Sequence, residues 1–293
     1  MADVKIDIKA SPFMESPVVP EQFDENHVIS FSCYKGISCF NACCRNIDIT
    51  LTPYDILRLK KRLGLTSGEF LRQYTYPFEF NKNSIAGVKL EPAAGGAECR
   101  FMNDEGCSVY TDRPTACRYY PVGLLSTRRA DENFDRSSYA LVREDHCKGH
   151  LEDREITVAD YRKEQGLEDY DEHGCGWRQL ILKMKSAGPA IGTPSRKSLQ
   201  LFFMACYDLD RFREFVKSEG FGATFDIDDA TCESLCTDDL ALLKFGEQMI
   251  RQVMFGEETI QKKGDAYDAL VARRQEQSQL RKEREGGEPS SDA

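Results

Sequence analysis

The sequence predicts a helix-rich α+β protein, in which an irregular cysteine-cluster metal domain is followed by a helical C-terminal extension. Three observations predict this fold class. Cysteines cluster among loop-forming residues in the first half of the chain, and two capped helices separate the two cysteine sets. From Val158 onward, apolar residues recur at helical spacing. The 293 residues are enough for one large domain or two modest ones.

These patterns divide the chain into four predicted segments. Residues 1–26 are predicted to be a flexible arm, because prolines interrupt them and apolar periodicity is absent. Residues 27–152 are predicted to form a cysteine-cluster metal-binding domain, and residues 153–274 a helical C-terminal region. Residues 275–293 form a charged tail without an apolar face, which we expect to be frayed or disordered.

Two helices are predicted between the cysteine sets. Thr52 suits the N-cap of the first helix, Pro53 suits its first position, and Gly64 suits its end. Thr66 and Glu69 have the spacing of a capping box, which begins a second helix at once. A folded helical pair, rather than a flexible linker, therefore separates the two cysteine sets.

Local patterns also predict the remaining elements. Residues 47–51 alternate between apolar and polar and predict a strand or a fixed loop, and residues 75–98 predict short strands and turns. Beyond the second cysteine set the pattern predicts four helices. They cover about 158–166, 175–186, 196–219, and from near Asp238 to about Phe255.

Composition limits the compartment and the partners. The formal net charge of −10 at pH 7 argues against binding nucleic acid, because phosphate recognition needs a basic face. Apolar stretches are too short to span a membrane, and the N-terminus lacks the basic start and apolar run of a secretory signal. We therefore predict a cytoplasmic protein that has neither a membrane nor a nucleic acid as its partner.

The cysteines carry the strongest functional signal in the chain. Four of them lie within twelve residues, and a second set begins at Cys99. Clustered thiols in a chain without an export signal indicate metal ligands before they indicate disulfides. Short loops can direct two sulfurs to one metal, which binds each thiolate at about 2.3 Å. We predict eight metal ligands: Cys33, Cys39, Cys43, Cys44, Cys99, Cys107, Cys117 and Cys147.

The adjacent pair Cys43-Cys44 bears on how these thiols are shared. Neighbouring side chains of an extended segment point in opposite directions, so such a pair is hard to aim at one metal and easy to aim at two. Eight thiols are enough for two four-thiolate sites, and equally for one iron–sulfur cluster with spare cysteines. The spacing matches neither common ferredoxin pattern. Zinc, iron and an iron–sulfur cluster all stay open as the cofactor.

Basic side chains beside the thiols are candidates for a supporting role. Four thiolates on a divalent metal carry a net charge of −2, which needs nearby cations. Arg113 and Arg118 flank Cys117 and are candidates to donate hydrogen bonds to the sulfurs. His146 and His150 are candidates to replace a thiol ligand, or else to face solvent.

Four cysteines outside the two sets give weaker signals. Cys206 lies on the apolar face of a predicted helix, which indicates a core position. Cys232 and Cys236 are spaced to share a helix face, but no further cysteine or histidine lies nearby in the sequence to complete a site. Cys175, close to His173, would supply half a site.

Several motifs in combination resemble a known family. They are Phe31-Ser32-Cys33, Cys39-Phe40-Asn41-Ala42-Cys43-Cys44, Leu51-Thr52-Pro53-Tyr54-Asp55-Ile56, Cys107-Ser108-Val109-Tyr110, Arg113-Pro114 and Cys117-Arg118-Tyr119-Tyr120-Pro121. Over about residues 28–150 the chain resembles the YkgJ-type cysteine-cluster family, a zinc- or iron-chelating domain with a CxxCxxCC-like cluster. Here five and three residues separate the first cysteines instead of two and two, which leaves ligand geometry and metal identity open. The resemblance implies a metal site and no particular reaction.

Three functions compete at this point. The first is a metal-binding protein whose clustered thiolates hold zinc or iron in a structural or metal-handling role. The second is an iron–sulfur enzyme such as a protein lysine N-methylase-like transferase, because some proteins with this cysteine pattern resemble a flagellin lysine N-methylase. The third is a binding module whose C-terminal helices dock a protein partner. The first is our prediction, and whether the protein is an enzyme stays open.

Overall fold

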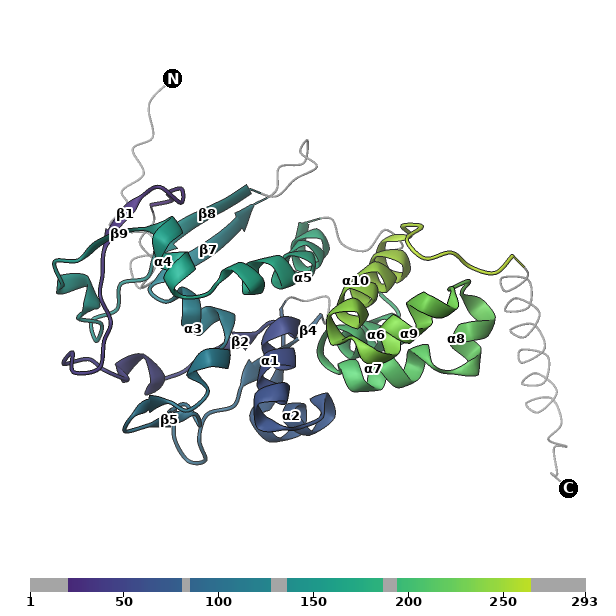
Figure 1. Ribbon diagram of the computed structural model, residues 1–293, viewed down its shortest axis with the longest axis horizontal. Helices are drawn as coiled ribbons and strands as arrows, with labels where there is room; N and C mark the ends of the chain where they lie inside the picture. The colour runs from purple at the N-terminus through teal and green to yellow at the C-terminus, as the bar shows by residue number, and fades with distance from the viewer. Residues whose placement is uncertain (1–20, 81–84, 128–135, 187–193, 265–293) are drawn as a thin grey trace, which may run out of the picture.

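The computed structural model describes residues 21–80, 85–127, 136–186 and 194–264, and it has the predicted helix-rich α+β class (Figure 1). Most of the predicted arm and all of the predicted charged tail lie outside the described residues. Phe23 exchanges two backbone hydrogen bonds with Tyr139, so the chain is attached to the fold from that point.

Elements in the cysteine-rich half are short. The strands are β1 (Val28–Ser30), β2 (Thr50–Leu51), β3 (Thr75–Glu79), β4 (Ala86–Leu90), β5 (Met102–Asn103), β6 (Gly106–Cys107), β7 (Val122–Thr127), β8 (Arg136–Leu141) and β9 (Glu155–Thr157). They pair as four small antiparallel sheets, in the orders β1-β9, β2-β4-β3, β5-β6 and β7-β8. The helices of this half are α1 (Pro53–Leu63), α2 (Ser67–Tyr74) and α3 (Thr115–Tyr119), with 3-10 turns η3 (Ala42–Cys44), η4 (Tyr110–Asp112) and η5 (Gly149–Leu151).

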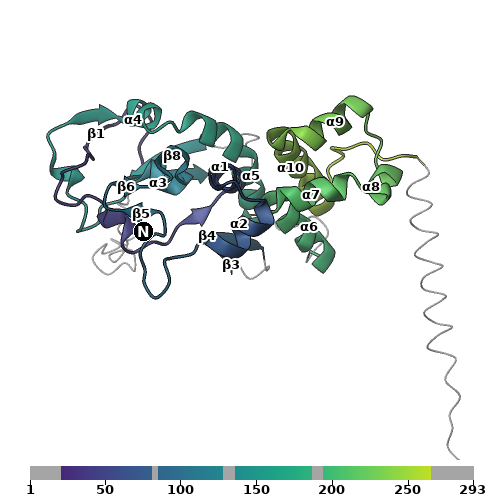
Figure 2. The same ribbon diagram turned by 60° about the horizontal axis from the view of Figure 1, so that its bottom comes forward.

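Helices dominate the rest of the described chain. They are α4 (Val158–Glu164), α5 (Glu168–Ser186), α6 (Arg196–Tyr207), α7 (Leu209–Val216), α8 (Glu219–Thr224), α9 (Asp229–Thr237) and α10 (Asp239–Phe255). In Figures 1 and 2 the helices α6–α10 gather at the end of the molecule opposite the cysteine-rich loops, and α5 lies between the two parts. Within the described residues, no helix is both long and apolar enough to cross a membrane.

The predicted helix boundaries between the cysteine sets are confirmed. Thr52 accepts a hydrogen bond from the Asp55 backbone N–H at the start of α1, and Gly64 ends that helix with a left-handed φ of 67°. Thr66 and Glu69 form the predicted capping box of α2. The possible strand at 47–51 is reduced to the two residues of β2.

One predicted helix is wrong as a continuous element. The expected helix over 196–219 breaks at Asp208, whose φ of −113° and ψ of 66° end α6 and begin α7. The Asp208 carboxylate accepts a hydrogen bond from the Ser67 hydroxyl at 2.6 Å. This contact with α2 is non-local, so the apolar period alone did not indicate the break.

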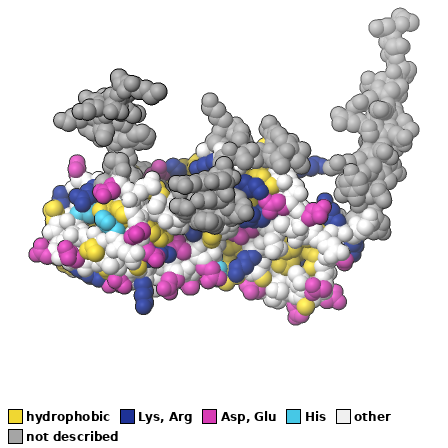
Figure 3. Space-filling model, turned by 90° about the horizontal axis from the view of Figure 1, so that it is seen from above, with side chains coloured by type: hydrophobic (Ala, Val, Ile, Leu, Met, Phe, Trp, Pro, Cys, Tyr) yellow, Lys and Arg dark blue, Asp and Glu magenta, His cyan; other side chains and the backbone are white. Residues whose placement is uncertain are grey.

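A hydrophobic core runs through both parts of the described chain. It includes Leu59 and Phe70 from the first two helices, Leu180 from α5, and Phe202 and Ile250 from α6 and α10. Helix α5 packs against both α1 and α10 and so joins the parts. The proposed boundary near residue 152 remains a prediction. In Figure 3, acidic and basic side chains are interspersed over the described part of the surface in view.

A half-buried carboxylate sits at the contact between α5 and α10. A Cβ atom at Gly176 would overlap the Glu247 carboxylate, so only glycine permits this close approach. Burial raises the pKa of Glu247 to about 7, against the opposing effects of Arg251, the Trp177 backbone N–H and Lys244. Glu247 is therefore largely protonated in the folded protein at pH 6.

Because the pKa of Glu247 is higher in the folded than in the unfolded chain, its protonation stabilises the fold below its unfolded pKa. That contribution is lost as the pH rises through the folded value of about 7. We expect Glu247→Gln to remove up to about 3 kcal/mol of the decrease in unfolding free energy between pH 5 and 8. Urea unfolding at several pH values measures this, with exposed Glu233→Gln as the control. An unchanged pH profile in Glu247→Gln would contradict the prediction.

Candidate metal centre

The eight cysteines of the two sets lie on loops and short elements of the cysteine-rich half, whose strands and helices are shown in Figure 1. Cys33 and Cys39 follow β1, and Cys147 precedes η5. We call these three the loop trio. Cys99 follows β4, Cys107 lies in β6 and Cys117 lies in α3, and we call these three the hairpin trio. Cys43 and Cys44, the vicinal pair, lie in η3.

Backbone hydrogen bonds hold the loop trio together. The Lys148 backbone N–H donates to the Cys39 Sγ at 3.2 Å. The Ser32 N–H donates to the Gly149 carbonyl at 3.1 Å, which attaches the segment carrying Cys33 to the segment carrying Cys147. Burial raises the pKa of the Cys33 thiol, and the nearby Cys43, Cys39 and Cys147 raise it further. The backbone contacts thus attach the segment that carries Cys33 and Cys39 to the segment that carries Cys147.

A different set of contacts holds the hairpin trio. The Cys99 N–H donates to the Cys44 carbonyl at 2.7 Å, and the Met102 N–H donates to the Cys99 carbonyl at 3.1 Å. Met102 pairs with Cys107 in the β5–β6 hairpin. Burial raises the pKa of Cys117, and the neighbouring Cys99 and Cys107 raise it further. The β5–β6 hairpin and α3 therefore bring a second set of thiols together.

The vicinal pair corrects one sequence-based expectation. Its segment is not extended but forms a 3-10 turn after Asn41, which has a left-handed φ of 63°. The Asn41 amide donates to the Asn103 carbonyl at 3.0 Å and so anchors the turn to β5. Consequently the Sγ atoms of Cys43 and Cys44 lie 3.9 Å apart and do not point in opposite directions.

The two thiols of the vicinal pair have pKa values shifted in opposite directions. A hydrogen bond from Cys44 lowers the pKa of Cys43 to about 7. The same bond, together with burial, raises the pKa of Cys44. A thiolate is the form that binds metal, so Cys43 is the member of the pair that is ready to ligate near neutral pH.

Thiolates are suitable ligands for zinc or iron, although the thiols are not arranged here as a complete coordination shell. Cys99 is buried, Cys33 and Cys43 are exposed, and the other five thiols are half-buried. In the described part of the chain, no three His, Cys, Asp or Glu side chains are close enough to hold a metal as they stand. Rearrangement of the thiol-bearing segments would therefore have to accompany binding, which couples ligation to local folding.

Comparison with known families agrees with this donor set. Residues 32–148 match the family model CxxCxxCC, described as "Putative zinc- or iron-chelating domain". The match spans 117 of the 293 residues, so this segment is similar to the family. The matched segment begins one residue before Cys33 and ends one residue after Cys147, so it contains all eight thiols. No curated protein and no solved structure matches the chain.

Arg113 is a basic side chain whose charge acts on thiols of both cysteine sets. Burial raises the pKa of Cys33 and of Cys107, and the positive charge of Arg113 opposes both rises. Its guanidinium stacks on Tyr110, with 3.9 Å from Cζ to the ring centroid, and donates to Gln165. The Arg113 Nε is buried and has no hydrogen-bond partner. This free donor suits a metal-bound sulfur.

Arg118, the other predicted sulfur donor, has a different role. Its three guanidinium nitrogens donate to the backbone carbonyls of Arg113, Gln165 and Thr111. The guanidinium also lies over the Tyr170 ring, with 4.2 Å from Cζ to the centroid. Arg118 therefore fixes the loop that carries Arg113 and does not donate to the thiols.

Sequence analysis named Asp55 only within a motif, whereas in the structure its side chain links two helices. Its fully buried carboxylate accepts hydrogen bonds from the Thr52 N–H at 2.8 Å, the Thr115 N–H at 2.8 Å and the Thr115 hydroxyl at 2.7 Å. It thus joins the start of α1 to the start of α3, which carries Cys117. Asp55 stands in the motif that follows the vicinal pair, but sequence gave no sign of its partner Thr115.

The remaining candidate ligands make other contacts or lie on other helices. His150 contacts the Val142 carbonyl through Nε2 at 3.1 Å. His146 stacks on Tyr120, with ring centroids 6.4 Å apart. Cys206 is buried in the core of α6, as predicted. Cys232 and Cys236 lie on α9, and no third candidate ligand among the described residues completes a site with them.

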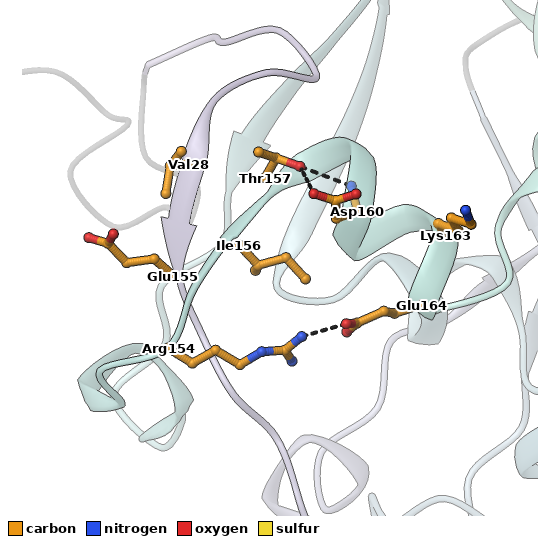
Figure 4. Close-up of a pocket in the computed structure, with 8 residues that line it drawn as sticks. All are labelled: Val28, Arg154, Glu155, Ile156, Thr157, Asp160, Lys163 and Glu164. Carbon is orange, nitrogen blue, oxygen red and sulfur yellow. Dashed lines mark hydrogen bonds and ion pairs between the residues drawn. The ribbon is translucent and has the colours of Figure 1, made fainter.

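A surface pocket of about 590 Å3 borders the CxxCxxCC domain at β1, β9 and α4 (Figure 4). Arg154 pairs with Glu164 across it, and Thr157 caps α4 by accepting the Asp160 N–H. Its lining consists of Val28, Arg154, Glu155, Ile156, Thr157, Asp160, Lys163 and Glu164, and includes no cysteine. This pocket does not present a thiol to a bound molecule.

Proposed function

We propose that this protein binds zinc or iron through the thiolates of Cys33, Cys39, Cys43, Cys44, Cys99, Cys107, Cys117 and Cys147, in a structural or metal-handling role. An iron–sulfur cluster is included in this proposal as one form of bound iron. One observation carries it. Backbone hydrogen bonds join cysteine-bearing segments that are far apart in the chain, such as Cys99 to Cys44 and Lys148 to Cys39.

The chemistry of these thiols supports metal ligation rather than disulfide bonds or a purely structural role as buried side chains. Thiolates are soft ligands that favour zinc and iron–sulfur centres. Burial raises the pKa of Cys99, Cys107 and Cys117, so these thiols stay neutral without a cation. A bound metal would displace their protons and close the surrounding loops. The buried, unpartnered Nε of Arg113 supports a negatively charged centre beside it.

Anaerobic purification followed by elemental analysis, acid-labile sulfide assay and a visible spectrum tests the proposal. Zinc without sulfide would support a structural or zinc-handling role. Iron with matching sulfide would support a cluster and would reopen the alternative of an iron–sulfur transferase. A folded protein that contains no metal after this purification, and takes up none when reduced, would contradict the proposal.

We expect Arg113→Gln to weaken metal binding roughly 10- to 100-fold, the range typical of groups that support metal ligands. The reason is the loss of a positive charge that opposes the rise of the Cys33 and Cys107 pKa and lowers that of Cys43. Competition with a chromogenic chelator measures the affinity. Arg113→Lys, which keeps the charge, should retain more affinity, and Arg45→Gln at an exposed position should change little. Equal affinities in all three variants would exclude this role.

A further inference from the structure

We infer that Gln165 is a positioning residue of the metal centre, which acts through Arg113 by leaving the Nε of that guanidinium free to donate to a metal-bound thiolate. This inference rests on the proposed function, because it assumes that the thiolates hold metal. It goes further by extending the centre to the turn between α4 and α5, which lies outside the family match over residues 32–148.

The Arg113 guanidinium is held in one orientation. Arg113 is 7% exposed, and its guanidinium stacks on the Tyr110 ring with 3.9 Å from Cζ to the centroid. This stack fixes the plane of the group, but not the direction of each of its edges within that plane. The hydrogen bond from Nη2 to the Gln165 Oε1 fixes that direction, because a guanidinium presents its N–H groups in a rigid planar fork. Gln165 therefore decides which N–H groups of Arg113 remain available.

Gln165 is itself fixed by the fold. It follows α4 as the C-cap, where its backbone N–H donates to the Tyr161 carbonyl at 2.9 Å. Its own carbonyl accepts from the Arg118 Nη1 at 2.6 Å. Gly166 comes next with a left-handed φ of 61°, and a Cβ atom there would lie 3.3 Å from that same Nη1. The turn thus offers the Gln165 side chain to Arg113 from a defined position.

The helix before this turn also holds the segment that carries Cys117. The Tyr161 hydroxyl, on α4, donates to the Tyr120 carbonyl at 2.5 Å, just beyond the end of α3. The Arg118 Nε donates to the Arg113 carbonyl at 3.2 Å and so ties α3 to the backbone of Arg113. The α4–α5 turn and the segment that carries Cys117 are therefore joined by several hydrogen bonds.

The unpartnered Nε of Arg113 indicates what the turn positions this side chain for. Within the described residues this buried N–H has no acceptor, and a buried donor without an acceptor is costly. Arg113 lies six residues after Cys107 and four residues before Cys117. Metal-bound thiolates are negatively charged acceptors, to which an arginine N–H is suited. A thiolate of this segment is therefore the acceptor that the Nε would take when metal is bound.

Cobalt binding to variants of the full chain tests the role of Gln165. Co2+ stands in for the unidentified metal, and competition with a chromogenic chelator under reducing, anaerobic conditions measures its affinity. We expect Gln165→Ala to weaken Co2+ binding roughly tenfold, at the lower end of the range for groups that support metal ligands. Gln165→Glu keeps an acceptor for Arg113 and should retain more of the affinity.

Gln179→Ala is the matched control. The Gln179 Oε1 also accepts from an arginine, the Arg251 Nη2 at 2.9 Å, but at the contact of α5 with α10. This variant should bind Co2+ as the wild type does. An equal loss of affinity in Gln179→Ala and Gln165→Ala would reflect general destabilisation, and the inference would be wrong.

Two further measurements separate a role through Arg113 from a merely structural one. The double variant Arg113→Gln/Gln165→Ala should bind Co2+ no more weakly than Arg113→Gln alone, because both changes remove the same interaction. The thiolate-to-cobalt absorption band should shift in the same direction in both single variants. Losses that add up in the double variant, or unchanged affinity in Gln165→Ala, would overturn the inference and leave metal binding intact. A wild type that binds no Co2+ would overturn the proposed function, and this inference with it.

Discussion

Replacing Asp55 with Ala should reduce the unfolding free energy by about 3–5 kcal/mol, a loss at the upper end for a single substitution. The carboxylate is fully buried and accepts hydrogen bonds from Thr52 and from both the N–H and the hydroxyl of Thr115. Removing it leaves these donors unpaired in the interior, and each unpaired group costs about 1–3 kcal/mol. Chemical unfolding monitored by circular dichroism measures the change.

The neighbouring helix supplies a matched control. Glu69 occupies the same capping-box position in α2 that Asp55 occupies in α1, but it is only half-buried, and its carboxylate accepts from the Thr66 N–H and hydroxyl. We expect Glu69→Ala to cost about 1 kcal/mol, as for an ordinary helix cap. Similar losses for the two substitutions would show that Asp55 acts only as a cap and does not join α1 to α3.

This comparison also shows how far the sequence determines the fold. Capping boxes join residues three apart, so Thr52 with Asp55 and Thr66 with Glu69 were predictable from the sequence. The bond from Thr115 to Asp55 spans 60 residues and leaves no local pattern. Sequence therefore predicted both helices and their starts, but not the contact that positions the segment carrying Cys117.

The thiol centre has the same division between local and non-local information. Clustering of cysteines predicted the metal-binding class, and the family match to residues 32–148 supports it. The conformation of the vicinal pair depends on the left-handed Asn41 and on its bond to Asn103, which lies 62 residues away. The assumption that Cys43 and Cys44 lie in an extended segment was therefore wrong. Strands of only two residues, such as β5 and β6, are likewise too short for periodicity to detect.

Removal of the proposed metal should also lower the stability of the folded protein strongly. If the bound metal is present at about 1,000 times its dissociation constant, it adds about 4 kcal/mol to the stability of the folded chain. For a chain of this size we expect a strong chelator under reducing conditions to lower the Tm by roughly 10 °C. Thermal unfolding with and without chelator measures the shift. The Cys232→Ser/Cys236→Ser variant should show the same shift, since those thiols lie on α9 and outside the centre.

The loss of stability on metal removal should be confined to one part of the molecule, because we expect the two parts to depend on metal to different degrees. Helices α6 and α10 pack through fully buried apolar side chains such as Phe202, Leu242 and Ile250. The segments 31–49 and 97–117 instead consist largely of loops, 3-10 turns and two-residue strands, and burial raises the pKa of their thiols Cys33 and Cys107, whose protonated form is favoured without a cation. Hydrogen exchange should therefore accelerate in these two segments after chelation, while α6 and α10 keep their protection. Unchanged exchange in both segments would mean that the loops hold their fold without metal, and the metal would then be cargo rather than a structural ligand.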